Sequence, residues 1–267
     1  MRAVLVSRYP RVDTPEWKRR VAEGLRSAGV DVAVLYSQAG LIDQARAGLR
    51  EEGVGVLRRY VTLRRGTGTS DASTQSLASW ARERGLPVEG SRRLDAERLR
   101  RLAPDLVVLL GADLVPPPVL AVPRLGTINA HYGLLPAYRG MNVTEWSVLR
   151  GDPVGVTVHL VDPGVDTGDI LLREEIALEA GETFATLRRK HQDVAARLLV
   201  RAALELGDGT ARPLPQAPEQ GRQYYRMHPS LRRAAEARLA DQASATAGAR
   251  STSPRSAAAA STSPSAT

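Results

Sequence analysis

Residues 105–131, DLVVLLGADLVPPPVLAVPRLGTINAH, contain two short apolar runs separated by a segment rich in glycine and proline. The first run, residues 105–110, is continuously apolar after its aspartate, which is typical of a strand buried on both faces of a sheet. The second run, residues 127–131, is a further predicted strand. Strands of this kind occur in parallel sheets that helices cover on both sides. The segment therefore indicates an α/β fold.

Predicted strands and helices alternate on both sides of this segment. The further predicted strands are residues 3–7, 31–36, 54–63, 154–161 and 169–176. The predicted helices are residues 14–28, 41–52, 76–84, 95–103, 144–150 and 183–206. This alternation indicates an open, mostly parallel, Rossmann-like sheet with helices on both faces. The last two strands are joined by a short turn, so we expect a hairpin at the sheet edge.

The chain divides by composition into three parts. Residues 1–206 carry the α/β pattern, and residues 207–240 are expected to form a C-terminal extension that packs on it. Residues 241–267 are rich in Ala, Ser, Thr and Pro and have few large apolar side chains to bury, so we expect a disordered tail. The roles of residues 53–95, of the extension and of the tail stay open.

Composition excludes several kinds of site and partner. The 267 residues include no cysteine, which excludes disulfides, thiolate catalysis and cysteine-ligated zinc. No apolar run is long enough for a membrane helix, and the first apolar run is too short for a signal peptide, so we expect a cytoplasmic protein without a membrane partner. The net charge of +8 comes mainly from arginines scattered along the chain. Without a basic stripe, a nucleic-acid partner is not expected.

The residues that carry chemistry cluster in residues 126–172. Asn129 and His131 are two apart at the end of a predicted strand, so their side chains project to the same face. Asp162, Asp166 and Asp169 follow in a loop between two later strands. An amide, an imidazole and a carboxylate at one rim of the sheet provide an oxyanion donor, a proton carrier and an orienting base. Spacing alone leaves open an ordinary structural role, with a hydrogen-bonded histidine and turn aspartates.

Three short motifs within this stretch resemble a known family. They are Asn129-Ala130-His131, Leu134-Leu135-Pro136 and Asp166-Thr167-Gly168. Together they resemble the 10-formyltetrahydrofolate-dependent formyltransferases, and weaker similarity extends over residues 105–206. Within that family the chain is most similar to the sugar N-formyltransferases and to the catalytic domain of methionyl-tRNA formyltransferase. The resemblance implies an enzyme that uses 10-formyltetrahydrofolate as co-substrate, without a metal, to formylate a primary amine.

The resemblance also implies roles for particular residues. Asn129 and His131 would stabilise an oxyanion, and Asp166 would hold His131 in its useful protonation state by raising its pKa. The residues implied to line the folate site are Gly111, Asp113, Leu114, Val115, Asp162 and Gly164. The residues implied to contact the acceptor are Tyr132, Arg139, Asn142 and the segment 220–226, for which a strap packed across the sheet is an equal alternative. We expect His159 to pack or hydrogen-bond rather than react, and His191 and His228 to lie at the surface.

Several functions remain as alternatives. The acceptor is expected to be a small-molecule amine, such as an amino-sugar nucleotide or a natural-product amine. The chain lacks the glycine-rich loop that would hold a ribonucleotide phosphate after the first strand, and only a short segment follows the last long helix, which disfavours a tRNA acceptor. A formyltetrahydrofolate hydrolase is the first alternative, and a methionyl-tRNA formyltransferase-like enzyme or a non-catalytic folate-binding protein is a further one. A homodimer through the edge hairpin is left open.

Overall fold

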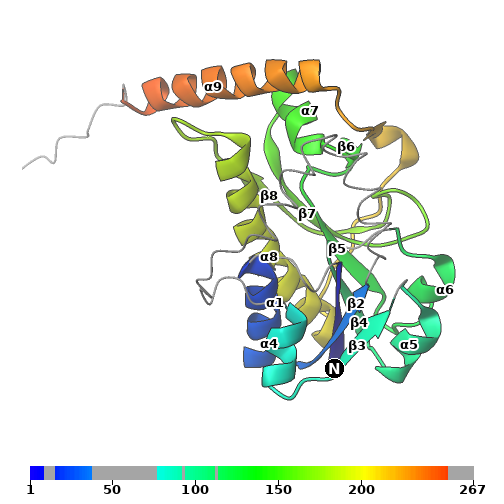
Figure 1. Cartoon of the computed structure of the whole chain (residues 1–267). Coiled ribbons are helices and arrows are strands. Elements are labelled where there is room, and N and C mark those ends of the chain that lie inside the picture. Colours follow the sequence, from blue (N-terminus) through cyan, green and yellow to red (C-terminus); the bar gives the residue numbers. More distant parts are fainter. Residues whose placement is uncertain (9–15, 38–76, 92–93, 112–113, 252–267) are drawn as a thin grey trace, which may run out of the picture.

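The computed structural model describes residues 1–8, 16–37, 77–91, 94–111 and 114–251, and its centre is a single twisted sheet (Figure 1). The strand order is β3-β2-β1-β4-β5-β7-β8. The strands are β1 (Arg2–Arg8), β2 (Asp31–Ser37), β3 (Val88–Ser91), β4 (Leu106–Leu110), β5 (Thr127–His131), β7 (Val154–Leu160) and β8 (Ile170–Ile176). The first five are parallel, whereas β7 and β8 are antiparallel and form the expected hairpin at the edge. The mostly parallel sheet is therefore confirmed.

Helices cover both faces of the sheet, as the sequence predicts. On one face lie α1 (Glu16–Ser27), α4 (Leu77–Glu83) and α8 (Phe184–Asp208). On the other face lie the shorter α5 (Ala96–Arg101) and α6 (Pro117–Leu120). Two further helices, α7 (Val143–Arg150) and α9 (Pro229–Ser251), pack against each other near the β7–β8 hairpin (Figure 1).

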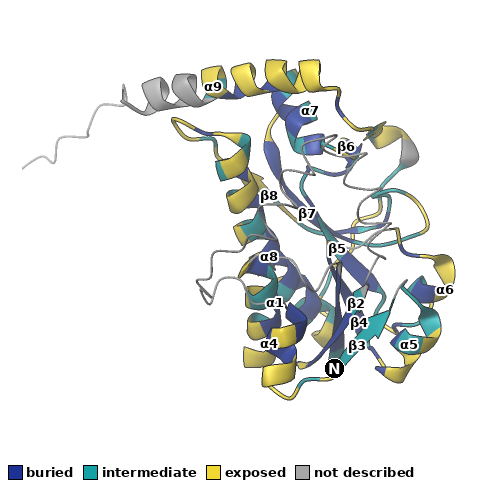
Figure 2. Cartoon of the chain, in the orientation of Figure 1, coloured by how far each residue is buried: buried dark blue, intermediate teal, exposed yellow. Residues whose placement is uncertain are grey.

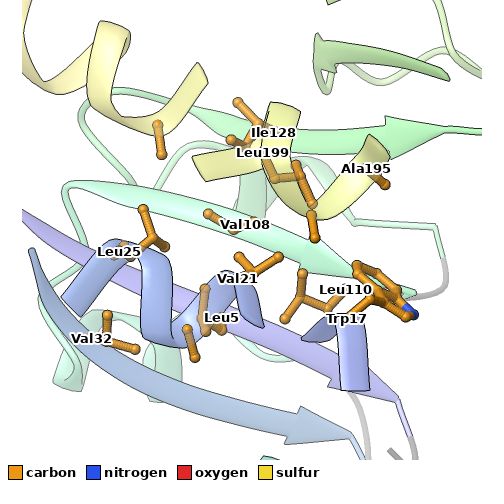
Figure 3. Close-up of a cluster of buried hydrophobic side chains, with 14 of the residues drawn as sticks. Leu5, Trp17, Val21, Leu25, Val32, Val108, Leu110, Ile128, Ala195 and Leu199 are labelled. Atoms are coloured by element: carbon orange, nitrogen blue, oxygen red, sulfur yellow. The ribbon is translucent and has the colours of Figure 1, made fainter. Parts of the chain in front are cut away.

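Alternating burial along the strands produces two hydrophobic cores. In β1, Leu5 faces the larger core with Val21 and Leu25 of α1 (Figure 3), while Val4 faces the smaller core on the α5 side. Every residue of β4 is buried, which agrees with the continuous apolar run that predicted it. Figure 2 shows the resulting pattern, with buried strands between helices whose outer faces are exposed. The central strands are thus rigidly held, and their carboxyl ends are fixed in space.

Helix α8 positions much of the site described below, and both of its ends have clear signals in the sequence. Thr183 caps the start, because its hydroxyl accepts a hydrogen bond from the amide of Thr186 at 3.1 Å while the Thr186 hydroxyl accepts one from the amide of Thr183 at 2.9 Å. The helix ends at Gly209, which adopts the left-handed conformation that glycine tolerates best.

The C-terminal segment after α8 crosses the molecule as a strap. Leu214 exchanges backbone hydrogen bonds with Ile170 at the start of β8. A second, two-stranded sheet then pairs β9 (Arg222–Tyr224) with β6 (Tyr138–Gly140), and the Tyr224 ring stacks on Tyr138 at 5.0 Å between centroids. Helix α9 follows and packs on α7. The extension therefore lies against the rest of the fold over most of its length.

Some expected elements differ from the structure or lie outside it. The predicted elements 41–52 and 54–63, and the first two residues of the predicted helix 14–28, lie outside the described residues. Strands β3, β6 and β9 were not predicted, since each has only three or four residues and depends on a distant partner. Helix α9 continues through residues 241–251, which we assigned to the disordered tail, because alanine-rich sequence favours helix even with little to bury.

Within the described part of the chain, no helix combines the length and apolarity needed to cross a membrane.

Candidate active site

Four polar side chains meet at the carboxyl end of β5. His131 is the last residue of β5, and its Nδ1 lies 3.3 Å from Oδ2 of Asp166 in the β7–β8 loop. His159 of β7 places its Nε2 3.5 Å from the other oxygen of Asp166 and 3.5 Å from the Asn129 amide nitrogen. The structure therefore brings together the three residues that the sequence singled out, and adds a second histidine.

The antiparallel pairing of β5 with β7 explains the position of His159. In this register Asn129 lies opposite His159 and His131 lies opposite Thr157. His159 is almost fully buried, and its Nδ1 donates to the carbonyl of Leu160 at 2.7 Å, which leaves Nε2 facing the cluster. The prediction that His159 hydrogen-bonds is confirmed, but its contact with Asn129 and Asp166 was missed, because it depends on which strand lies beside β5.

Asp166 is held by its backbone conformation and by its neighbours. It has a positive φ of 54°, which is uncommon for residues other than glycine and is best tolerated by Asp and Asn. Its Oδ2 also accepts a hydrogen bond from the amide of Gly140 at 2.9 Å. The loop is closed by Gly168, where a Cβ atom would lie 2.0 Å from the carbonyl oxygen of Leu160. The chain has little freedom to move Asp166 away from His131.

The environment shifts the pKa values of both partners. Burial of Asp166 opposes its ionisation, but its hydrogen-bonding contact with His159, the electrostatic effect of His131 and the Gly140 amide outweigh this and lower the pKa of Asp166 to about 2. Burial lowers the pKa of His131, and the Asp166 carboxylate offsets this only in part. Asp166 therefore raises the pKa of His131 as expected, but burial has the larger effect and the net shift is downward, since His131 is more deeply buried than the sequence could show.

The contacts of His131 nevertheless favour the gain of a proton during a reaction. Its Nε2 donates to the carbonyl of Tyr138 at 2.7 Å, so this nitrogen carries the hydrogen in the neutral ring. Nδ1 then faces the Asp166 carboxylate with a free lone pair. A proton placed on Nδ1 would be shared with Asp166 at once. The pair is thus arranged to accept and hold one proton from a neighbouring group.

A cavity of about 390 Å³, here called the loop cavity, lies on one side of this cluster. Its walls combine apolar side chains with the Asp166 loop. It is lined by Leu109, Leu114, Val115, Asn129, Gly140, Met141, His159 and residues 161–166. Four of the residues predicted to hold a folate line it, namely Leu114, Val115, Asp162 and Gly164. Asp113 lies outside the described residues, and Gly111 lines a different cavity.

That second cavity, the strand-end cavity, has a volume of about 430 Å³ and lies beside Asn129 and His131. It is lined by Trp17, Lys18, Leu109, Gly111, Asn129, Ala130, His131, Tyr132, Gly140, Asn142, Val143, Thr144, Glu145, Arg188 and Gln192. The amine of Lys18 donates to the hydroxyl of Ser7 at 3.0 Å, and burial lowers the pKa of Lys18 to about 8. Lys18 was missed by sequence reasoning, because nothing in the pattern of α1 shows that its first turn faces the end of β5.

A third cavity of about 390 Å³, the arginine cavity, shares five lining residues with the second. It is lined by Tyr132, Thr144, Glu145, Phe184, Ala185, Arg188, Arg189, His191, Gln192 and Arg232. His191 was expected at the surface, but it is only 1% exposed, because it lies on the inner face of α8 with its ring 5.2 Å from that of Tyr132. Burial lowers the pKa of His191 to about 4. His228 is exposed, as predicted.

Two residues predicted to contact an acceptor form hydrogen bonds with the strap. Arg139 is buried and donates to the side chain of Gln216 and the carbonyl of Ala217. The side-chain oxygen of Asn142 accepts from the amide of Met227 at 3.1 Å, although Asn142 also borders the strand-end cavity. Tyr132 lines both the strand-end and arginine cavities. In the segment 220–226, Tyr224 packs as a strap residue, whereas Tyr225 is 70% exposed.

Among the described residues, no three histidine, aspartate or glutamate side chains are grouped so that they could hold a metal ion.

Comparison with known proteins places this site in a family context. A sequence profile that describes formyl transferases matches residues 61–203, which is over half of the chain. A methionyl-tRNA formyltransferase of Pelotomaculum thermopropionicum is 36% identical over 125 residues, which cover 46% of this chain and 39% of that protein. The chain matches less than half of the length of this and similar curated relatives.

Solved structures share the fold at lower sequence identity. Glycinamide ribonucleotide transformylase 1 of Symbiobacterium toebii is 23% identical with a TM-score of 0.56, covering 80% of this chain and 93% of that one. An N-formyltransferase of Helicobacter canadensis, solved with folinic acid and dTDP-3-aminofucose, is 15% identical with a TM-score of 0.55, covering 90% of this chain and 80% of that one. These matches confirm the resemblance and the fold expected from the sequence.

Proposed function

Because the chain belongs to the formyl transferase family, we propose that it transfers a formyl group from 10-formyltetrahydrofolate to the primary amine of a small molecule. The observation that carries this proposal is the position of Asn129, which lines both the loop cavity and the strand-end cavity. A donor in the first cavity and an acceptor in the second would meet at Asn129 and beside His131.

The loop cavity has the chemistry to hold the folate. Its apolar walls include Val115 and Val161, while Leu114 and Met141 are exposed at 82% and 50% and offer apolar surface to a flat ring. Polar groups of the Asp162–Asp166 loop lie on the same wall and can fix the ring's orientation. The folate supplies the formyl carbon, bound to nitrogen, that the acceptor attacks.

The side chains around Asn129 can assist each part of the transfer. A bond forms between the acceptor nitrogen and the formyl carbon, the bond from that carbon to the folate nitrogen breaks, and the proton lost by the amine passes to the departing nitrogen. The Asn129 amide can donate a hydrogen bond to the negative oxygen that develops on the formyl carbon. His131 can take the amine proton on Nδ1, and Asp166 can hold it there until it moves on.

The acceptor side suits a small molecule such as an amino-sugar nucleotide. The strand-end cavity of about 430 Å³ has the size of a small-molecule site and shares lining residues with the arginine cavity. The Helicobacter canadensis protein was solved with an amino-sugar nucleotide, whereas the curated relatives are named for methionyl-tRNA. We also propose that residues 1–206 form the catalytic domain and that the residues from 207 to the end of α9 are an extension packed on it.

The test is release of tetrahydrofolate from 10-formyltetrahydrofolate by the purified full chain. The acceptors to compare are amino sugars, amino-sugar nucleotides, glycinamide ribonucleotide, methionyl-tRNA, amino acids and a mixture without acceptor. We expect release that depends on one class of small amine, and His131→Ala should lower it by about 100- to 1,000-fold. His228→Ala is the matched control, because it removes an exposed histidine outside the site.

Other outcomes would contradict the proposal in different ways. Equal release with and without amines would identify a hydrolase. Release only with methionyl-tRNA would replace the small acceptor by a nucleic acid. Binding of 5-formyltetrahydrofolate without release from any mixture would indicate a folate-binding protein without this activity.

A further inference from the structure

We propose that Glu145 binds the protonated amine of the acceptor inside the strand-end cavity, beside His131. This inference rests on the proposed formyl transfer and deepens it, because it names the residue that recognises the reacting amine itself. Its evidence is the burial of the Glu145 carboxylate, the lack of a partner for it among the described residues, and the charges that line the cavity.

Glu145 is a buried carboxylate that the protein leaves without a partner. It is 5% exposed, and within the described part of the chain no side chain or backbone amide forms a hydrogen bond or ion pair with it. Burying a charge is strongly unfavourable unless another group satisfies it. The side chain lines both the strand-end and the arginine cavity, so a ligand bound there can supply the missing partner.

Glu182 shows how the same chain treats a second buried glutamate. Glu182 is 7% exposed, and its carboxylate lies 2.5 Å from the amine of Lys190 and accepts a hydrogen bond from the hydroxyl of Thr186. It lines none of the three cavities described above. The glutamate that faces a cavity is therefore the one that lacks a protein partner, which is the pattern expected of a ligand-binding group.

The position of Glu145 in α7 gives it only part of a structural role. Asn142 is the N-cap, so Glu145 is the third residue of the helix, where the helix dipole favours acidic side chains. A glutamate at this position can also accept a hydrogen bond from the amide of the N-cap residue. No such bond joins Glu145 to Asn142, both of which the structure describes. The dipole lowers the cost of the charge without occupying the carboxylate oxygens.

The other charges of the strand-end cavity make a carboxylate necessary if an amine is to bind there. Lys18 and Arg188 are the cations among its lining residues, and Glu145 is the one carboxylate among them. Primary amines have a pKa of about 10 in water, so the acceptor arrives as an ammonium ion that both cations repel. The Glu145 carboxylate offsets this repulsion and accepts a charge-assisted hydrogen bond from the ammonium. Asp166 lines the loop cavity instead.

Glu145 acts at binding and takes no part in the bond changes of the transfer. The ammonium loses one proton to solvent to become the attacking amine, and the remaining steps are those given above. The neutral amine still has hydrogens to donate to the carboxylate, so the contact persists as the attack begins. Loss of the carboxylate should therefore raise the KM for the acceptor and leave kcat nearly unchanged, which separates Glu145 from His131.

The first experiment measures thermal unfolding of the full chain without ligand, by circular dichroism. Glu145→Gln and its matched control Glu182→Gln each remove the charge of a buried glutamate with little change in shape. We expect Glu145→Gln to leave the unfolding temperature unchanged or to raise it by about 3 °C, because an unpaired buried charge is removed. Glu182→Gln should lower it by about 5 °C, because Lys190 loses its partner. A Glu145→Gln protein that unfolds below wild type would show a structural role and would overturn the inference.

The second experiment compares the same proteins in the tetrahydrofolate release assay, with the amine of the panel above that is formylated fastest as acceptor. We expect Glu145→Gln to raise the KM for this amine about 30-fold, because a charge-assisted hydrogen bond is lost, and to change kcat by less than about threefold. Glu182→Gln should keep the wild-type KM. The same molecule with a hydroxyl group in place of the amine should inhibit wild type and Glu145→Gln to within about threefold, since it carries no positive charge at that position.

The outcomes separate this inference from the proposed function. An unchanged KM for Glu145→Gln would overturn the inference, as would a large fall in kcat at unchanged KM. An equal loss of affinity for the amine and for its hydroxyl analogue would assign Glu145 to another group of the molecule and would also overturn it. Failure of the proposed function appears in wild type instead: no amine would then support tetrahydrofolate release by any of the three proteins, and the inference would fail with it.

Discussion

The end of β5 and the inner face of α8 each bury a histidine, and the two histidines differ in the partner of the second ring nitrogen. His131 and His191 are 7% and 1% exposed, and each places one ring nitrogen 2.7 Å from a backbone carbonyl. The second nitrogen of His131 faces the Asp166 carboxylate, whereas Nε2 of His191 has no hydrogen-bond partner among the described residues. Burial lowers the pKa of both rings.

The comparison teaches what a carboxylate adds to a buried imidazole. Where no carboxylate contacts the ring, as at His191, the pKa falls to about 4 and the ring serves packing. With one in contact, as at His131, burial still lowers the pKa, but the Asp166 carboxylate acts in the opposite direction and a proton gained on the ring has a place to remain. The predictions below test this difference, beginning with the largest expected effect.

Asp166→Asn should remove the distinction between the two histidines. Asparagine keeps the shape of the side chain and tolerates the positive φ, but it cannot hold a proton on His131. We expect kcat for formyl transfer to fall by about 1,000-fold, equivalent to roughly 4 kcal/mol, with a smaller change in KM. Steady-state kinetics measure this, with Asp169→Asn in the same loop as control. An Asp166→Asn enzyme within tenfold of wild type would show that the carboxylate is not needed for turnover.

His191 should affect stability towards acid instead of turnover. Its folded pKa of about 4 lies below the ordinary value of 6.5, so the unfolded chain binds the proton first as the pH falls. The neutral His191 ring therefore makes its full contribution to the free energy of unfolding above pH 6.5. As the pH falls from 6.5 to about 4, roughly 3 kcal/mol of this free energy is lost. Urea unfolding at pH 7, 5.5 and 4.5 should show a steeper loss for wild type than for His191→Gln. The exposed His228→Gln should follow wild type, and parallel curves for all three would contradict the assignment.

Lys18 tests whether burial alone, without a carboxylate, acts in the same way on a cation. Its folded pKa of about 8 lies below the ordinary 10.5, so the cost of burying its charge is complete below pH 8 and disappears as the pH rises to about 10.5. We expect Lys18→Met to raise the free energy of unfolding at pH 7 by about 2 kcal/mol. The difference from wild type should shrink between pH 8 and pH 10, and a constant difference would mean that the Lys18 charge is not buried.

His159→Gln should have the smallest effect, because His159 acts through its contacts with Asn129 and Asp166. It lies 3.5 Å from both Asn129 and Asp166, and hydrogen bonding to it lowers the pKa of Asp166. We expect kcat to fall by about tenfold, or 1.4 kcal/mol, and the acidic limb of the pH–rate profile to move to higher pH. A purely structural role would lower the unfolding temperature and leave the pH profile unchanged.

The sequence predicted those parts of the molecule that depend on local pattern. The period of two along residues 127–131 placed Asn129 and His131 on one face, and the buried run at residues 106–110 indicated the parallel sheet. The chain's family could also be identified from its motifs. The catalytic roles of Asn129, His131 and Asp166 remain predictions.

Features that depend on distant pairing were not predictable in this way. His159 enters the cluster because β7 lies beside β5, and Lys18 because the first turn of α1 faces the same end of the sheet. Arg139 looked like a ligand-binding residue, but the strap supplies Gln216 and Ala217 as its partners from about 80 residues further along the chain. No pattern within residues 126–172 reveals the path of that strap.

The position of Asn129 on the wall between two cavities has a consequence for the order of events. Because the cavities proposed for donor and acceptor both border Asn129, the proposed transfer would be direct and would require both substrates at once. We therefore expect a sequential rather than a ping-pong scheme, with reciprocal plots at several fixed folate concentrations that intersect instead of running parallel. In such a scheme neither substrate reacts until the other is bound in its own cavity.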